Sequence, residues 1–103
     1  MNVKINSVHF KADKKLEAFI NEKLEKLHTF FEGVIGSEVM LKTDNTETRA
    51  NKIAEVRLLI KGYDLFAKKE AATFEAAIDL ASDALRKQLV KHKEKVKGIY
   101  RLI

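Results

Sequence analysis

The sequence predicts an α+β fold with the element order β-α-β-β-β-α, in which a four-stranded mixed sheet carries two helices packed on one face. Two long segments have apolar residues at helical spacing, and the segments around them alternate apolar and polar residues as half-buried strands do. The chain has 103 residues, of which 46% are hydrophobic and 34% are charged. That length suits one compact domain, and that composition supplies enough apolar surface for a core.

The N-terminal third predicts a strand followed by a helix. Residues 2–10 alternate, with Val3 and Ile5 on one face. Asp13 then offers an N-cap for an amphipathic helix of about five turns, because its carboxylate can accept hydrogen bonds from the first free amides. The apolar stripe of this helix comprises Leu16, Phe19, Ile20, Leu24, Leu27 and Phe31.

Three further strands joined by short connections are expected at residues 38–43, 53–60 and 65–71. The last two are joined by a turn at residues 61–64, where Gly62 tolerates a positive φ. Short connections predict antiparallel pairing among these three strands, whereas the helix after the first strand implies a crossover to a parallel neighbour. The bulky aromatic residues expected in the core are Phe30, Phe31 and Phe66.

A second helix is expected to begin after Thr73, a candidate N-cap, and to end at Gly98. Residues 1–98 would then form one domain, and residues 99–103 a short C-terminal tail that folds back, frays or meets another chain, with the first two uses favoured. The apolar side of the helix comprises Phe74, Ile78, Ala81, Leu85, Leu89 and Val96.

The positive charge of the chain is concentrated near its C-terminus. The net charge is +5, yet residues 1–85 hold 13 basic and 14 acidic side chains, whereas residues 86–103 hold seven basic and one acidic. A helix dipole favours cations mainly in its last turn, and these cations extend over about three turns. An anionic partner is therefore predicted for this helix.

Several classes of protein are excluded or disfavoured. No apolar run approaches the roughly 20 residues of a membrane span, and the N-terminal residues lack the apolar stretch of a secretory signal, so a cytoplasmic protein is expected. The absence of Cys excludes disulfides and thiolate sites. His9, His28 and His92 fall in three different expected elements without a catalytic or metal-binding motif, so neither an enzyme nor a metal or cofactor site is expected.

The second helix resembles the signature helix of a known family. Residues 76–79 read Ala-Ala-Ile-Asp, and residues 91–95 read Lys-His-Lys-Glu-Lys. These runs are similar to those of the hibernation promoting factors and ribosome-associated inhibitor A proteins. The resemblance extends over most of the chain and implies a domain similar to a double-stranded-RNA-binding fold. Further residues that match the family are Leu16, Phe19, Lys23, Lys26, Leu27, Phe31, Leu85, Gln88 and Leu89.

The resemblance implies a protein that binds the small ribosomal subunit, its 16S-type rRNA and neighbouring ribosomal proteins, near the decoding centre. There it would block mRNA and tRNA binding and keep ribosomes inactive under stress or slow growth. The chain ends at Ile103, too early for the ribosome-pairing domain of longer members, so it resembles the short form. A separate ribosome-dimerising factor is a further expected partner.

The cations of both helices are the expected RNA contacts, since Lys and Arg match phosphates in position and charge. Solvated pairing with neighbouring Glu residues is an alternative for the two lysines of the first helix. For His92 a packing role is favoured over an RNA contact, and for Tyr63 cross-strand packing is favoured over base stacking. The expected RNA-binding residues are Lys23, Lys26, Arg86, Lys87, Lys91, His92, Lys93, Lys95 and Lys97.

One competing function is a protein-interaction module. The same basic helix could bind an acidic protein or regulate a sigma factor, as an older label of the family suggests. Sedimentation with ribosomes at low and high salt would separate the two functions.

Overall fold

The structure, a computed structural model, describes residues 2–31, 33–44 and 51–101, with residues 93–101 described as backbone alone. The predicted class and element order are confirmed. None of the helices that it describes is both long enough and apolar enough to cross a bilayer. The elements are β1 (Asn2–Ser7), α1 (Lys14–Phe30), β2 (Val34–Thr43), β3 (Lys52–Ile60), β4 (Tyr63–Ala71) and α2 (Phe74–Arg101).

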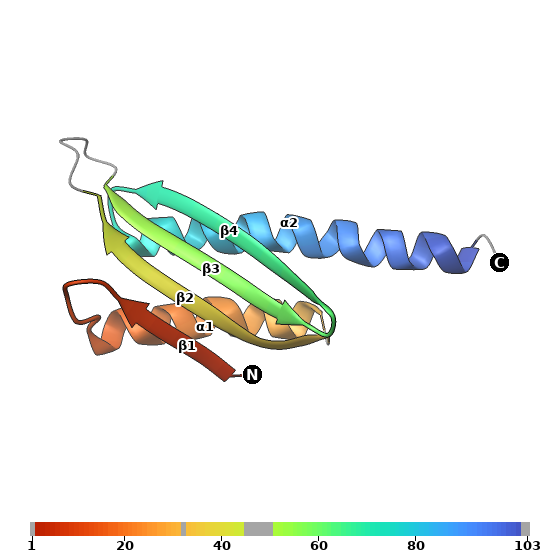
Figure 1. Ribbon diagram of the computed structural model, residues 1–103, viewed down its shortest axis with the longest axis horizontal. Helices are drawn as coiled ribbons and strands as arrows, with labels where there is room; N and C mark the ends of the chain where they lie inside the picture. The colour runs from red at the N-terminus through yellow and green to blue at the C-terminus, as the bar shows by residue number, and fades with distance from the viewer. Residues whose placement is uncertain (1, 32, 45–50, 102–103) are drawn as a thin grey trace.

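The four strands form one mixed sheet in the order β1-β2-β3-β4 (Figure 1). β1 pairs parallel to β2, with Ile5 opposite Val39, and the remaining pairs are antiparallel, as predicted. β1 approaches β2 closely at Gly36, where a Cβ would lie 2.9 Å from the backbone oxygen of Asn2. A residue with a side chain would push these strands apart at this point.

Both helices cover the same face of the sheet (Figure 1). α2 packs against β3 and β4, and α1 packs beside α2 and against β1 and β2. Strand alternation turns side chains such as Val56 and Leu58 toward the helices, where both are fully buried. The predicted apolar stripes of the helices pack against these strand side chains. Ile20 and Leu24 of α1 and Leu85 of α2 are each 0% exposed. Burial of such side chains stabilises the fold by about 2 kcal/mol each.

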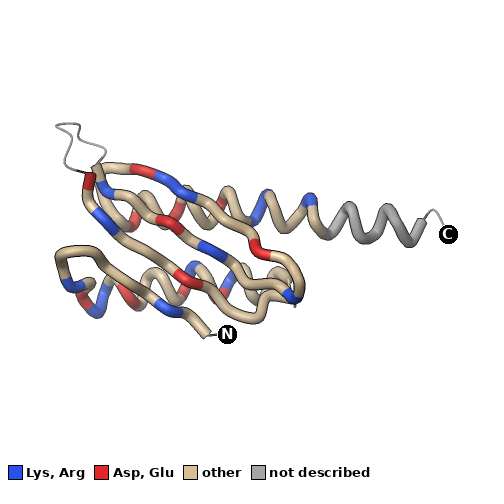
Figure 2. The backbone as a smooth tube through the Cα atoms, viewed as in Figure 1, with Lys and Arg blue, Asp and Glu red and all other residues tan. Residues whose placement is uncertain are grey.

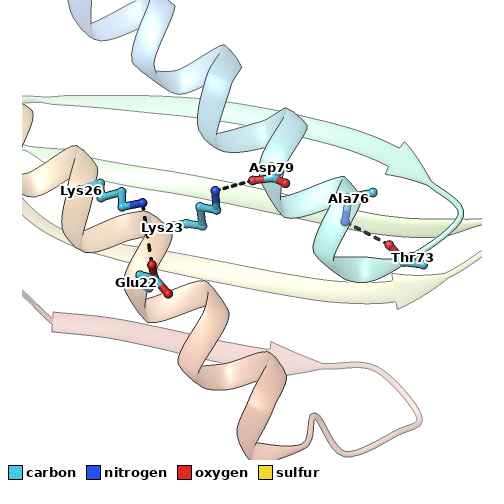
Figure 3. Close-up of polar contacts among 6 residues, drawn as sticks. All are labelled: Glu22, Lys23, Lys26, Thr73, Ala76 and Asp79. Atoms are coloured by element: carbon cyan, nitrogen blue, oxygen red, sulfur yellow. Dashed lines mark hydrogen bonds and ion pairs between the residues drawn. The ribbon is translucent and has the colours of Figure 1, made fainter.

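Each helix begins at the cap that the sequence predicts. The Asp13 carboxylate accepts a hydrogen bond of 2.8 Å from the amide of Leu16 at the start of α1. The Thr73 hydroxyl accepts one of 3.1 Å from the amide of Ala76 at the start of α2 (Figure 3). These bonds satisfy amides that have no partner within their own helix.

The predicted end of the second helix is wrong. α2 does not end at Gly98 but continues to Arg101, because one glycine in a helix costs only about 1 kcal/mol relative to alanine. Residues 99–101 of the expected tail therefore belong to the helix, and residues 102–103 lie outside the described residues.

The prediction that Phe66 lies in the core is also wrong. Its side chain lies on the sheet face opposite the helices, and the residue is 45% exposed. Leu65 and Ala67 occupy the inward positions of β4, so the residue between them must point outward. The Arg57 guanidinium lies 6.0 Å from the Phe66 ring. Phe30 and Phe31 are partly buried and pack against the core, as expected.

Candidate nucleic-acid interface

A groove of about 340 Å³ runs between α1 and α2 and collects charged side chains from both helices. Residues three or four apart share a helix face. This spacing places Lys23 and Lys26 together on α1, and places Asp79, Asp83 and Arg86 together on α2. The groove therefore brings three predicted RNA-binding cations together with two carboxylates.

Lys23 is the most constrained of these cations. Its ammonium lies 2.8 Å from the Asp79 carboxylate across the groove, and its side chain is 29% exposed (Figure 3). The same ammonium lies 5.4 Å above the Phe19 ring. The hydrogen bond to Asp79 and the attraction of its charge raise the pKa of Lys23, with a smaller contribution from Glu22, while partial desolvation opposes them. Lys23 is thus positively charged and held between the helices.

Lys26 and Lys87 form looser pairs within their own helices. Lys26 lies 3.8 Å from Glu22, with both side chains about two-thirds exposed at 68% and 67% (Figure 3). Lys87 lies 3.2 Å from Asp83, and its side chain is 75% exposed. Exposed pairs of this kind contribute about 0–1 kcal/mol, so both ammonium groups can exchange a carboxylate for a phosphate at little cost. The predicted solvated pairing is therefore present at Lys26, and it does not conflict with RNA binding.

Arg86 is positioned by an aromatic ring. Its guanidinium lies 5.6 Å from the centroid of the Phe30 ring, at the α1 side of the groove. A cation–π attraction of this kind holds the guanidinium near the ring while leaving its N–H groups free to donate. Arg86 can therefore present a bidentate donor pair to a phosphate.

His92 contacts two aromatic rings. Its imidazole stacks on Tyr63 with ring centroids 5.4 Å apart and meets Phe31 edge-on at 5.5 Å. The packing role favoured from the sequence is present, and an RNA contact by His92 stays a prediction.

The remaining predicted residues differ in how they are placed. Lys91 is exposed, and together with Lys87 it lies outside the groove on α2. Lys93, Lys95 and Lys97 belong to α2, but their side chains lie outside the described residues. Figure 2 shows acidic residues near the start of α2 and basic residues farther along the coloured part of this helix.

Five residues that line the groove were absent from the predicted RNA-binding set, namely Leu27, Phe30, Asp79, Ser82 and Asp83. A helical wheel could have located the two carboxylates, because 100° per residue puts them within about 60° of Arg86. Phe30 had been assigned to the core, and its contact with Arg86 depends on how the two helices cross. Among the described residues, no three His, Asp or Glu side chains form a group that could hold a metal ion.

Comparison with known proteins identifies the family. A family profile described as "Sigma 54 modulation protein / S30EA ribosomal protein" matches residues 3–97. The ribosome hibernation promoting factor of Pseudomonas putida is 30% identical over 99 residues, covering 96% of this chain and 93% of the relative. That of Klebsiella oxytoca is 30% identical over 97 residues, covering 94% and 98%. These names describe ribosome factors rather than enzymes, in agreement with the predicted class.

Two solved structures share the fold. The N-terminal domain of Thermus thermophilus Protein Y superimposes with a TM-score of 0.77 at 24% identity, covering 89% of this chain and 99% of that domain. A ribosomal subunit interface protein from Coxiella burnetii gives a TM-score of 0.80 at 17% identity, covering 90% and 98%. The family resemblance seen in residues 76–79 and 91–95 is confirmed by the profile and the relatives. The chain belongs to the family of sigma 54 modulation proteins and S30EA ribosomal proteins.

Proposed function

We propose that this protein is a ribosome hibernation factor that binds the small ribosomal subunit near the decoding centre. It does so through a basic helical surface, by which we mean Lys23, Lys26, Arg86, Lys87 and Lys91. Bound there, it excludes mRNA and tRNA and keeps ribosomes inactive under stress or slow growth. The site of action is then the cytoplasm.

The observation that carries the proposal is the convergence of cations from two helices at one groove. Lys23 and Lys26 reach it from α1 and Arg86 reaches it from α2, although about 60 residues separate them in the chain. Folded RNA presents phosphates on more than one strand, and two rows of cations on rigid helices can contact such strands together. The relatives in Pseudomonas putida and Klebsiella oxytoca, both named as hibernation promoting factors, support the same role.

The chemistry of the surface favours recognition of RNA shape. Its cations are charged donors that match phosphate oxygens, which fix the position of a protein without reading bases. Asp79 and Asp83 cancel part of the positive charge in the groove, so its net charge is +1 from three cations and two carboxylates. Affinity then depends on whether the phosphates of a ligand are spaced to meet these cations. An RNA with matching phosphate positions is expected to bind more tightly than an arbitrary polyanion.

The proposal is tested by sedimentation of a stationary-phase lysate through a sucrose gradient at low and high salt. Comigration of the protein with small subunits or whole ribosomes at low salt, and its release at high salt, is the expected result. Recovery only in light fractions at both salt concentrations would contradict the proposal and favour the protein-interaction module. A shift into the ribosome-dimer fraction that requires a second factor would identify the expected dimerising partner.

A further inference from the structure

Three aromatic rings form a cluster next to the basic helical surface. Tyr63 and His92 are stacked, with centroids 5.4 Å apart and planes inclined by 12°. Phe31 meets the same imidazole edge-on, at 5.5 Å and 88°. Tyr63 begins β4, His92 belongs to α2, and Phe31 follows the last residue of α1, so three elements hold the cluster in place.

Tyr63 makes a stacking contact and is nevertheless more than half exposed. Tyr63 is 54% exposed, whereas His92 and Phe31 are partly buried. Within the described part of the chain, His92 is the ring that stacks on it. One face of the phenol lies toward the imidazole, and more than half of the residue remains accessible to a ligand.

The strand that carries Tyr63 is fixed to the helix that carries His92. The Gln88 side chain donates a hydrogen bond of 3.0 Å to the backbone oxygen of Phe66, which joins α2 to β4 one turn before His92. Tyr63 also pairs with Ile60 in the β3–β4 ladder. The ring is therefore held in place before a ligand stacks on it, which lowers the entropy cost of binding.

Cations lie beside the cluster on the elements that build it. Lys91 directly precedes His92 and is exposed, and Lys61 is exposed in the turn before Tyr63. Arg86 lies six residues before His92, about 9 Å along the helix axis, and its guanidinium lies 5.6 Å from the centroid of the Phe30 ring, the neighbour of Phe31. Exposed aromatic residues near cations are used by proteins to stack on an unpaired base and to bind its phosphates.

We propose that Tyr63, supported by His92 and Phe31, is a stacking platform for an unpaired nucleobase of the RNA that the basic helical surface contacts. This inference rests on the proposed function and adds a base contact to a surface otherwise limited to phosphates. Stacking accepts any base, since every base has a π-face, so the platform favours single-stranded RNA over duplex without requiring a sequence.

Tyrosine fluorescence gives a direct test, because the chain has two tyrosines and no tryptophan. The Tyr100→Phe variant leaves Tyr63 as the one tyrosine. A short single-stranded RNA oligonucleotide is titrated into this variant, and an abasic oligonucleotide of equal length serves as the matched probe. Quenching by the RNA and little quenching by the abasic probe is the expected result. Equal quenching by both probes, or quenching by an acidic peptide instead, would contradict the proposal that Tyr63 is a stacking platform.

Affinity of the same RNA for two Tyr63 variants separates stacking from packing. Tyr63→Phe keeps the aromatic face and is expected to bind as the parent does. Tyr63→Leu keeps apolar bulk without a π-face and is expected to lose affinity by about tenfold. Unchanged affinity of the folded Leu variant would contradict the proposal, and if that variant unfolds, the fluorescence titration still decides.

Sedimentation with small subunits distinguishes failure of this inference from failure of the proposed function. If the parent protein sediments with small subunits and Tyr63→Leu does so equally well, without RNA quenching of Tyr63, the platform alone is wrong. If RNA quenches Tyr63 and the parent does not sediment with subunits, the proposed function is wrong and the base-stacking face stands.

Discussion

The ammonium of Lys23 on α1 lies 2.8 Å from the carboxylate of Asp79 on α2, and this ion pair spans the groove between the helices (Figure 3). Asp79 closes the Ala-Ala-Ile-Asp run that identifies the family in the sequence. The pair links the two rows of cations to each other, and under the proposed function it also places a negative charge where an RNA phosphate would approach. Asp79 is therefore expected to act on stability and on RNA binding in opposite directions.

Replacing Asp79 by Asn should lower Tm by no more than about 4 °C, because the pair is partly exposed. It should also raise affinity for a non-specific RNA about two- to fivefold, since one repulsive charge leaves the groove. Thermal unfolding and fluorescence anisotropy measure the two effects. Asp83→Asn is the matched control, because it removes the same charge from the groove without breaking a contact between helices. Equal Tm values for the two variants would show that the Lys23–Asp79 pair does not stabilise the fold.

The raised pKa of Lys23 predicts how that stabilisation depends on pH. A lysine with a folded pKa above its ordinary value of 10.5 stabilises the fold fully at lower pH, and the contribution disappears as pH rises through the folded pKa. The Tm difference between the parent and Asp79→Asn should therefore be constant near neutral pH and shrink above about pH 10. Thermal unfolding in a pH series measures this difference. A Tm difference that is unchanged at high pH would show that the stabilisation does not depend on the lysine charge.

Burial along α2 predicts two contrasting leucine substitutions. Leu85 is 0% exposed in the core, so Leu85→Ala should lower the free energy of unfolding by about 2–5 kcal/mol. Leu80 is 48% exposed on the same helix, so Leu80→Ala should change it by about 0.5 kcal/mol or less. Chemical denaturation measures both values. Similar losses for the two variants would contradict the orientation of α2 against the sheet.

Phosphate contacts by the basic helical surface predict a steep dependence on salt. If about five phosphates are neutralised, affinity should fall roughly a hundredfold between about 50 and 200 mM salt, from a slope of about −0.7 per contact. Removing two charges in Lys87→Gln with Lys91→Gln should reduce the magnitude of the slope by about 1.4. Small-subunit binding measured across a salt series tests both values. A flat salt dependence would point to an interface without phosphate contacts.

The spacing of hydrophobic residues predicted much of the fold, because buried residues recur with the period of the helix or strand that carries them. The alternation of β3 and the stripe of α2 predicted the burial of Val56 and Leu85, both of which are 0% exposed. The same physics explains the error at Phe66, where a large ring was assigned to the core against the alternation of its own strand. The helix end predicted at Gly98 is wrong because a single glycine destabilises a helix only slightly, and α2 continues past it.

The site was predictable within each helix but not between helices. The composition of residues 86–103 indicated a basic helix, and the family resemblance added Lys23 and Lys26. The partners across the groove depend on how α1 and α2 pack, which spacing along one helix does not encode. Sequence alone therefore left the Lys23–Asp79 pair undetected, and it did not show that Tyr63 rests on His92.

The central claim is that cations of α2 hold the protein on the small subunit, and charge reversal of Lys87 and Lys91 tests it most directly. Both are exposed and lie outside the core, so the variant with Lys87→Glu and Lys91→Glu should fold normally. The matched control reverses Lys4 and Lys68, two exposed lysines that strand alternation places on the sheet face opposite the helices. Co-sedimentation with purified small subunits should be lost in the first variant and kept in the control. Equal co-sedimentation of the two folded variants would contradict the claim.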